Sequence, residues 1–188
     1  FHPRTFWAEL ADTGATIFHY LGVIPPILLK QPPSPGERSH AIRFAVGAGV
    51  EPQLHAEFEQ RFGFPLLEVW GMTETGGGFI AAGEPRHVDT RAFGRPNRDM
   101  LARVVDDQDN EVPPDTDGEL TVRRRGPDPR RGFFSAYLKN PEATAEAWRG
   151  GWFHTGDVVR QDASGMLYFV DRKKNIIRRS GENIAAAE

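Results

Sequence analysis

Segments of helical and of strand character alternate over residues 1–82, and this alternation restricts the fold more than any other feature of the chain. Helices are expected at residues 3–12, where apolar side chains recur at helical spacing, and at residues 52–62, which begin with a proline suited to the first helical turn. Strands are expected at residues 15–21, 42–46 and 65–70. Such alternation is typical of a layered α/β fold with a largely parallel sheet.

The pattern changes near Pro85, after which short strands follow turn signals at close spacing. These strands are expected at residues 102–105, 119–123, 158–160 and 166–170, the last two as a hairpin across Asp162-Ala-Ser-Gly165. One helix, at about residues 141–148, interrupts them. The second half of the chain is therefore predicted to form an antiparallel sheet or a small barrel.

Composition excludes several classes of protein. The 188 residues contain no cysteine, so a disulfide framework and a thiolate zinc site are both impossible. The net charge of -3 provides no overall attraction to nucleic acid. No apolar run approaches the roughly 20 residues that a membrane span needs, and no signal peptide is visible. We therefore expect a cytoplasmic protein without a membrane span.

The two ends of the sequence are unusual. The chain begins at Phe1 rather than at a methionine, and it stops within what reads as a helix start, at Ala185-Ala-Ala-Glu188. We therefore expect an internal piece of a longer protein.

The segment Trp70-Gly-Met-Thr-Glu-Thr75 follows an expected strand, so it would lie at the carboxyl end of a sheet, where open α/β sheets bind ligands. Trp70 offers a flat ring for a base, and Gly71 lets the backbone approach a ligand closely. Thr73 is a hydroxyl donor, and Glu74 is a hard oxygen ligand for Mg²⁺. The alternative is a strand-to-loop turn with a buried tryptophan.

A second glycine-containing segment, Gly47-Ala48-Gly49, also follows an expected strand. Its small residues could leave room for a flat ring, or they could pack against a neighbouring element. It lacks the third glycine of a dinucleotide fingerprint. The packing interpretation is therefore the stronger one for this segment taken alone.

The segment Gly151-Trp-Phe-His-Thr-Gly-Asp157 is more specific, because two glycines, two aromatic residues and an aspartate are rarely kept together for packing alone. The carboxylate of Asp157 could accept both hydroxyls of a ribose diol. The alternative is an aspartate that caps a turn. His154 has no partner visible in the sequence, and we interpret it as structural.

The segment Asp171-Arg-Lys-Lys-Asn-Ile-Ile-Arg-Arg179 is basic, and its apolar interruption indicates a strand. Arg172 directly follows an apolar strand end and could point at a site. A solvated face or a nucleic-acid patch is the alternative. Ser180-Gly-Glu-Asn183 then supplies a glycine turn that could line a channel.

Taken together, these motifs resemble those of the adenylate-forming (AMP-binding) enzymes, which include acyl-CoA synthetases, luciferases and peptide-synthetase adenylation domains. Their order and spacing match, and residues 132–144 and 118–123 resemble two further elements of the family. The resemblance implies an α/β fold: the later part of the large adenylate-forming domain, with a mostly parallel layered sheet followed by an antiparallel β-barrel-like subdomain, plus the start of the small C-terminal domain. The expected domains are residues 1–85, 86–173 and 174–188.

The resemblance also implies a reaction in two steps, with ATP, Mg²⁺ and CoA taking part. A small carboxylic acid attacks the α-phosphate of ATP to give an acyl-adenylate and pyrophosphate, and the thiol of CoA then displaces AMP. By resemblance, the adenine would lie between Trp70-Gly71 and the segment Gly47, Ala48 and Gly49. Thr73 would contact the α-phosphate, and Glu74 would bind Mg²⁺.

The remaining implied roles fall on the last part of the chain. Asp157 and Arg172 would hold the ribose hydroxyls. Lys174 falls at the hinge of the small domain, and Ser180, Gly181 and Glu182 would approach the pantetheine arm of CoA. The family's phosphate loop would lie upstream of Phe1 and its adenylation lysine beyond Glu188, so the chain alone is expected to be inactive or nearly so.

Three other functions remain open. An adenylation domain that loads a carrier protein would differ from a CoA ligase only in its flanking sequence. A non-catalytic nucleotide-binding module would bind AMP without any missing segment. A nucleic-acid binder would use the arginines at 123–125, 130–131 and 172–179, but the acidic balance of the chain disfavours it.

Overall fold

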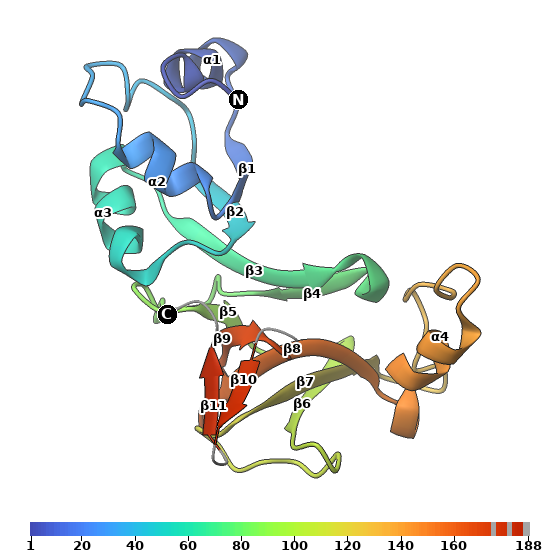
Figure 1. Cartoon of the computed structure of the whole chain (residues 1–188). Helices are drawn as coiled ribbons and strands as arrows, with labels where there is room; N and C mark the ends of the chain where they lie inside the picture. Colours follow the sequence, from blue (N-terminus) through green and yellow to red (C-terminus); the bar gives the residue numbers. More distant parts are fainter. Residues whose placement is uncertain (174–175, 180–181, 186–188) are drawn as a thin grey trace. The chain divides into compact units, whose positions relative to one another are not determined.

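The chain forms two compact units in a computed structural model that describes residues 1–173, 176–179 and 182–185 (Figure 1). The first unit comprises Phe1–Trp70 and Ile80–Phe93, and the second comprises Gly71–Phe79 and Gly94–Glu188. Two short strands, β4 (Gly77–Ile80) and β5 (Ala92–Gly94), lie where the chain passes between the units. The expected boundaries of the sequence domains, after residues 85 and 173, remain predictions.

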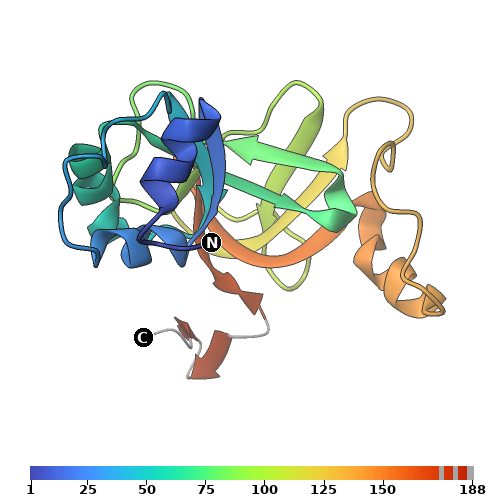
Figure 2. The ribbon, with the colours of Figure 1, turned by 90° about the horizontal axis from the view of Figure 1, so that it is seen from above.

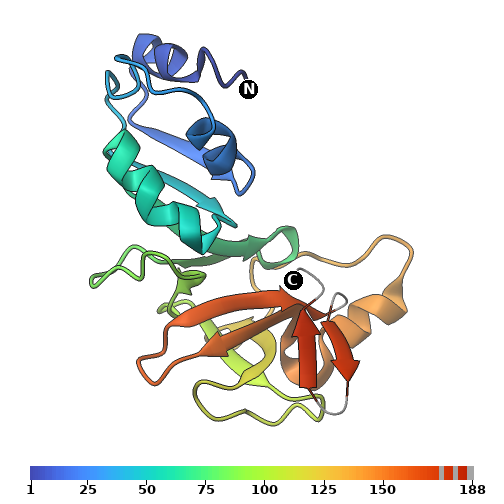
Figure 3. The same cartoon turned by 60° about the vertical axis from the view of Figure 1, so that its left-hand side comes forward.

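The first unit contains a parallel sheet with strands in the order β1 (Ile17–Leu21), β2 (Phe44–Ala48) and β3 (Leu66–Met72). Its helices are α1 (Phe6–Thr13), α2 (Ile24–Leu29) and α3 (Pro52–Phe62), and α2 lies beside α3 (Figure 3). The expected alternation of helices and parallel strands is therefore confirmed.

Helix α3 illustrates how the sequence sets these elements. Pro52 occupies its first turn, where a missing N–H costs nothing, and Gly63 ends it in the left-handed conformation with φ 83°. The helix buries Phe58 and Phe62, whose ring centroids are 4.6 Å apart. Phe62 also packs against Trp7 of α1 with centroids 4.4 Å apart, so α1 and α3 share one apolar core.

The second unit contains an antiparallel sheet with strands in the order β6 (Met100–Val105), β7 (Asp117–Arg124), β8 (Phe153–Gln161) and β9 (Leu167–Arg172). Figure 2 shows β8 as a long curved strand. The expected hairpin is confirmed as β8–β9, closed by the turn at residues 162–166. The apolar core of this sheet includes Met100, Leu120, Val122, Phe153 and Leu167, and the same strands also bury polar side chains such as Glu119 and Asp157.

The other elements of the second unit are short. They are the 3₁₀ turns η1 (Thr73–Thr75) and η2 (Arg149–Gly151), the helix α4 (Pro141–Ala147) and the antiparallel pair β10 (Ile176–Arg179) and β11 (Glu182–Ala185). Asn140 caps α4, because its Oδ1 accepts a hydrogen bond of 3.0 Å from the N–H of Ala143. Among the described residues, no helix combines the length and apolar character that crossing a bilayer requires.

Candidate functional site

The segment Gly47-Ala48-Gly49 ends β2, and its first glycine faces Tyr20 on the neighbouring strand β1. A Cβ at Gly47 would lie 2.2 Å from the carbonyl oxygen of Tyr20 and 2.6 Å from its ring, so no larger residue fits there. Gly49 has φ 85°, and a Cβ at Gly22 would lie 2.2 Å from its carbonyl oxygen. These glycines thus have a packing role, and their contact with an adenine ring remains a prediction.

Glu68 on β3 fixes this segment, and the sequence analysis missed it. Its carboxylate accepts hydrogen bonds from the backbone N–H groups of Gly49 (2.8 Å) and Val50 (3.3 Å), and from the hydroxyl of Tyr20. Burial raises the pKa of Glu68, and burial together with the neighbouring Glu68 raises the pKa of Tyr20. The only signal in the sequence was an acidic residue inside an apolar strand, two positions before Trp70.

Trp70 is 7% exposed, and its ring centroid lies 6.0 Å from that of Phe93 within the first unit. This is the buried tryptophan that the alternative interpretation expected. Stacking of Trp70 near adenine remains a prediction.

The predicted phosphate and magnesium residues follow in the second unit, where η1 carries Thr73 and Glu74. The hydroxyl of Tyr137 donates a hydrogen bond of 3.2 Å to Oε1 of Glu74. The N–H of Phe134 donates one of 2.8 Å to the carbonyl oxygen of Glu74. Burial and the Glu74 carboxylate raise the pKa of Tyr137. Residues 134–137 therefore hold Glu74 in place, a contact that the sequence analysis did not foresee.

Gly71 and Gly76 show how closely the backbone packs around η1. A Cβ at Gly76 would lie 2.1 Å from the carbonyl oxygen of Gly132, and one at Gly71 would lie 3.4 Å from that of Gly77. Gly76 also has φ 57°. Glycine at position 76 lets the 132–137 segment approach the 3₁₀ turn, whereas the contact at Gly71 is an ordinary van der Waals distance.

The structure brings the two predicted ribose residues together. Asp157 on β8 faces Arg172 on β9, and the Nε of Arg172 lies 2.9 Å from Oδ1 of Asp157. The Asp157 side chain is 1% exposed, whereas that of Arg172 is 45% exposed. Arg172 also lines a cavity of about 470 Å³ with Thr155, Gly156 and Lys173. A polar ligand in this cavity could therefore reach the Arg172 side chain of the pair.

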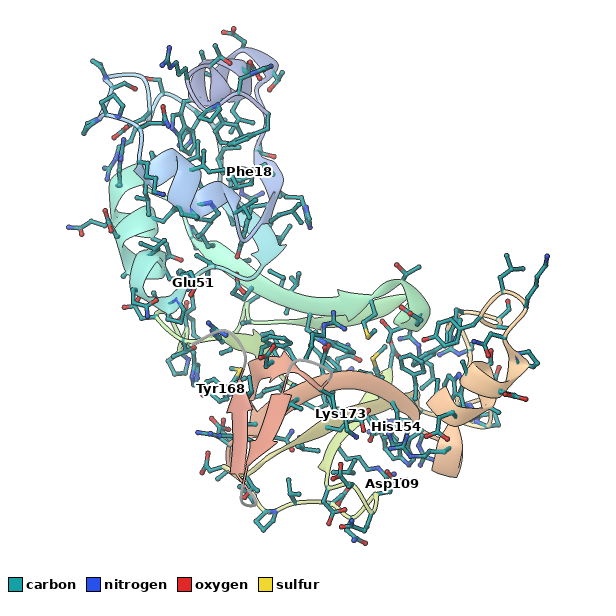
Figure 4. All side chains as sticks on the ribbon, in the orientation of Figure 1. Phe18, Glu51, Asp109, His154, Tyr168 and Lys173 are labelled. Carbon is teal, nitrogen blue, oxygen red and sulfur yellow. The ribbon has the colours of Figure 1, made fainter. Side chains whose placement is uncertain are left out.

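A cluster of ionisable side chains lies on the same unit around Glu119 of β7, and Figure 4 shows three of its members, Asp109, His154 and Lys173. Lys173 Nζ donates to Oε2 of Glu119 at 2.7 Å, and His154 Nδ1 lies 3.3 Å from the same oxygen. His154, which has no partner visible in the sequence, is thus paired with a buried carboxylate. Burial opposes ionisation of Glu119, but the bonds from His154 and Lys173 outweigh it and lower the pKa of Glu119 to about 2.

Four predicted site residues lie wholly or partly beyond this description. Lys174, Ser180 and Gly181 fall outside the described residues. Glu182 begins β11, of which only the backbone is described. Within the described ranges, no three His, Asp or Glu side chains group in a way that could hold a metal ion, so Glu74 as a magnesium ligand remains a prediction.

A protein-family model described as AMP-binding enzyme matches residues 1–134 of the chain. The chain is 36% identical over 195 residues to the crotonobetaine/carnitine–CoA ligase of Citrobacter koseri, covering 100% of this chain and 36% of that protein. It is 35% identical over 193 residues to the ligase of the same name from Salmonella typhimurium, again covering 36% of that protein. The chain thus spans little more than a third of the length of these curated relatives.

Solved structures show the same fold. The anthranilate CoA ligase AuaEII in complex with anthranoyl-AMP matches with a TM-score of 0.82 at 19% identity, covering 97% of this chain and 34% of that one. ATP-bound MatB from Rhodopseudomonas palustris matches with a TM-score of 0.81 at 25% identity, covering 98% of this chain and 36% of that one. The expected fold, the later part of a large adenylate-forming domain, is confirmed.

Proposed function

Because this chain belongs to the AMP-binding enzyme family, we propose that its full-length protein activates a carboxylic acid with ATP and transfers the acyl group to CoA. The pairing of Asp157 with Arg172 beside a cavity carries this proposal, since it joins a buried carboxylate to a cation that solvent can reach. The relatives are named as CoA ligases, which supports CoA as the acceptor.

In the proposed first step, a carboxylate oxygen of the acid attacks the α-phosphorus of ATP, an acyl-adenylate forms and pyrophosphate leaves. Charge accumulates on the phosphate oxygens as this bond forms, so donors held in advance lower the barrier. We assign this role to Thr73 on η1. In the second step, the thiol sulfur of CoA attacks the acyl carbonyl carbon and its proton passes to solvent. AMP leaves with the electron pair of the broken bond between the acyl carbon and the phosphate oxygen.

We propose separate contacts for the base and for the ribose of the nucleoside. Trp70, Gly71 and the segment Gly47, Ala48 and Gly49 would contact adenine, and the contacts of Glu68 with Gly49 and Val50 support a fixed backbone there. Asp157 would accept the ribose hydroxyls, with Arg172 beside it.

Glu74 would hold Mg²⁺, because a carboxylate oxygen is the hard ligand that this ion prefers, and Tyr137 already orients it. A magnesium ion bound there would offset the negative charge of the phosphates. We propose Lys174 as the hinge of the small domain. Ser180, Gly181 and Glu182 are proposed to contact the pantetheine arm of CoA.

The acid is proposed to be small and moderately apolar. Leu21 ends β1 and Val23 follows it, and their side chains are 62% and 61% exposed. They offer apolar surface at the carboxyl end of the strand, where ligands bind in open α/β folds.

The test is a calorimetric titration of the full-length protein with AMP and with a non-hydrolysable acyl-adenylate analogue, with and without Mg²⁺. Asp157→Ala should weaken both ligands by at least tenfold, as loss of a charge-assisted hydrogen bond predicts. Asp117→Ala is the matched control, because it breaks the exposed ion pair with Arg160 on the same sheet. A folded wild-type protein that bound neither ligand would overturn the proposal.

A further inference from the structure

We propose that Glu119 is a positioning residue for nucleotide binding: its single carboxylate holds the backbone beside Asp157 and the side chain that follows Arg172. The inference rests on the proposed function, since it concerns the pair to which the ribose contact is assigned. It gives a role to a residue of the 118–123 element, to which the resemblance assigned none.

The first contact is between Glu119 and the backbone of β8, at a place where the strand lacks regular pairing. In the register of β7 with β8, Glu119 faces Val158 and Thr121 faces His154, so one residue of β7 spans three of β8 (residues 155–157). The strand therefore bulges where it carries Asp157, and the regular ladder between β7 and β8 is interrupted there.

Two hydrogen bonds take the place of that ladder. The hydroxyl of Thr155 donates to the carbonyl oxygen of Leu120 at 2.7 Å. The N–H of Gly156 donates to Oε1 of Glu119 at 3.1 Å, and Gly156 has φ 70°, a conformation that glycine adopts without strain. The Glu119 carboxylate thus fixes the residue immediately before Asp157.

The second contact holds the other half of the pair. Oε2 of Glu119 accepts a hydrogen bond of 2.7 Å from Nζ of Lys173, which directly follows Arg172 at the end of β9. Each oxygen of one carboxylate therefore holds one of the two strands that present Asp157 and Arg172. Figure 4 shows Lys173 and His154 near one another on this unit.

The remaining charged neighbours keep Glu119 ionised. His154 Nδ1 and Arg149 Nη2 lie 3.3 Å and 3.4 Å from Oε2. Two aspartates share these basic neighbours: Asp109 lies 3.2 Å from Nε of Arg149 and 3.7 Å from Nε2 of His154, and Asp107 lies 3.5 Å from Nζ of Lys173. Since Glu119 is only 6% exposed, this set of neighbours also determines where its carboxylate points.

The experiment is a double-mutant cycle on the full-length protein. Glu119→Ala should weaken AMP binding about tenfold by calorimetry and raise the KM for ATP by a similar factor, while the KM for the acid changes less than twofold. In the Asp157→Ala background, Glu119→Ala should have little further effect on AMP affinity, because both changes remove the same contact. Asp117→Ala, on the same strand, is the control.

Glu119→Gln keeps the size and the acceptor for Gly156 but loses the charge that attracts Lys173, so it should show an intermediate loss and serves if Glu119→Ala does not fold. Additive effects of Glu119 and Asp157 on AMP affinity, or equal changes in both KM values, would overturn the positioning role. Wild-type protein that bound no AMP would instead overturn the proposed function as well.

Discussion

The Nε of Arg172 lies 2.9 Å from Oδ1 of Asp157, directly across the β8–β9 hairpin. The two side chains differ sharply in environment, because Asp157 is buried and Arg172 is nearly half exposed. The buried carboxylate is thereby oriented by a cation whose far side faces solvent. Substitutions at the two positions should therefore have different consequences.

Arg172→Gln is expected to weaken AMP binding several-fold and to lower the free energy of unfolding less than Asp157→Asn does, because the glutamine amide can still donate a hydrogen bond to the buried carboxylate of Asp157. Asp157→Asn should lower both the affinity for AMP and the free energy of unfolding, since the buried amide no longer carries the charge that pairs with Arg172. Calorimetry with AMP and urea denaturation of both variants measure the two effects. An Arg172→Gln protein as unstable as Asp157→Asn would contradict this expectation.

Tyr137→Phe should raise the Mg²⁺ concentration that gives half-maximal ATP–pyrophosphate exchange in the full-length protein, by about tenfold. The reason is that the Tyr137 hydroxyl orients the Glu74 carboxylate, and loss of such supporting bonds typically costs about 10–100-fold in metal affinity. Tyr168→Phe provides the control, because its hydroxyl instead bonds Asp162 in the β8–β9 turn. An unchanged Mg²⁺ dependence in Tyr137→Phe would count against Glu74 as the metal ligand.

Gly47→Ala should destabilise the protein by about 1–3 kcal/mol, since its Cβ would overlap the carbonyl oxygen and ring of Tyr20. Gly36→Ala makes a fair comparison, because a Cβ there meets nothing within 4 Å. Urea denaturation of the two variants reports the difference. Equal stability of the two would mean that β1 and β2 can separate at low cost.

Glu59 should make the fold sensitive to acid. Burial opposes its ionisation, but hydrogen bonds from His55 (3.0 Å) and Arg86 (3.0 Å) lower the pKa of Glu59 to about 2. The ordinary pKa of glutamate in an unfolded chain is about 4.3. The stabilisation is therefore present above about pH 4.3 and is lost as the pH falls towards 2.

Accordingly, Glu59→Gln should be less stable than wild type at pH 6 but lose less of its free energy of unfolding between pH 6 and pH 3. Urea denaturation at several pH values measures this, with the exposed Glu142→Gln as control. Parallel pH profiles for wild type and Glu59→Gln would show that Glu59 is not the group responsible.

Elements with strong local signals were predictable from the sequence. Helix α3 was expected at its observed residues, because a proline begins it, a glycine follows it and three apolar residues share one face. Helix α2 was missed, since its sequence Ile-Pro-Pro-Ile-Leu-Leu is too short for periodicity and contains two prolines. Both prolines fall in its first turn, where they are tolerated.

The candidate site was predictable to a similar, partial degree. Asp157 and Arg172 stood out because each belongs to a compact motif, and the hairpin that joins them was also visible. Glu68 and Glu119 were not singled out, because their partners come from other strands and the register of those strands is set by tertiary packing. An isolated acid in an apolar strand is the signal that could have found Glu68. Glu119 does not stand out in this way, because β7 also carries Asp117, Arg123 and Arg124.

The β8–β9 hairpin has a consequence for the order of folding. Its strands are neighbours in the sequence and are joined by a tight turn, so closing it costs little chain entropy. The parallel strands β1 and β2 instead pair only after the intervening α2 segment has been placed. Asp157 and Arg172 can thus meet early, through local chain closure alone.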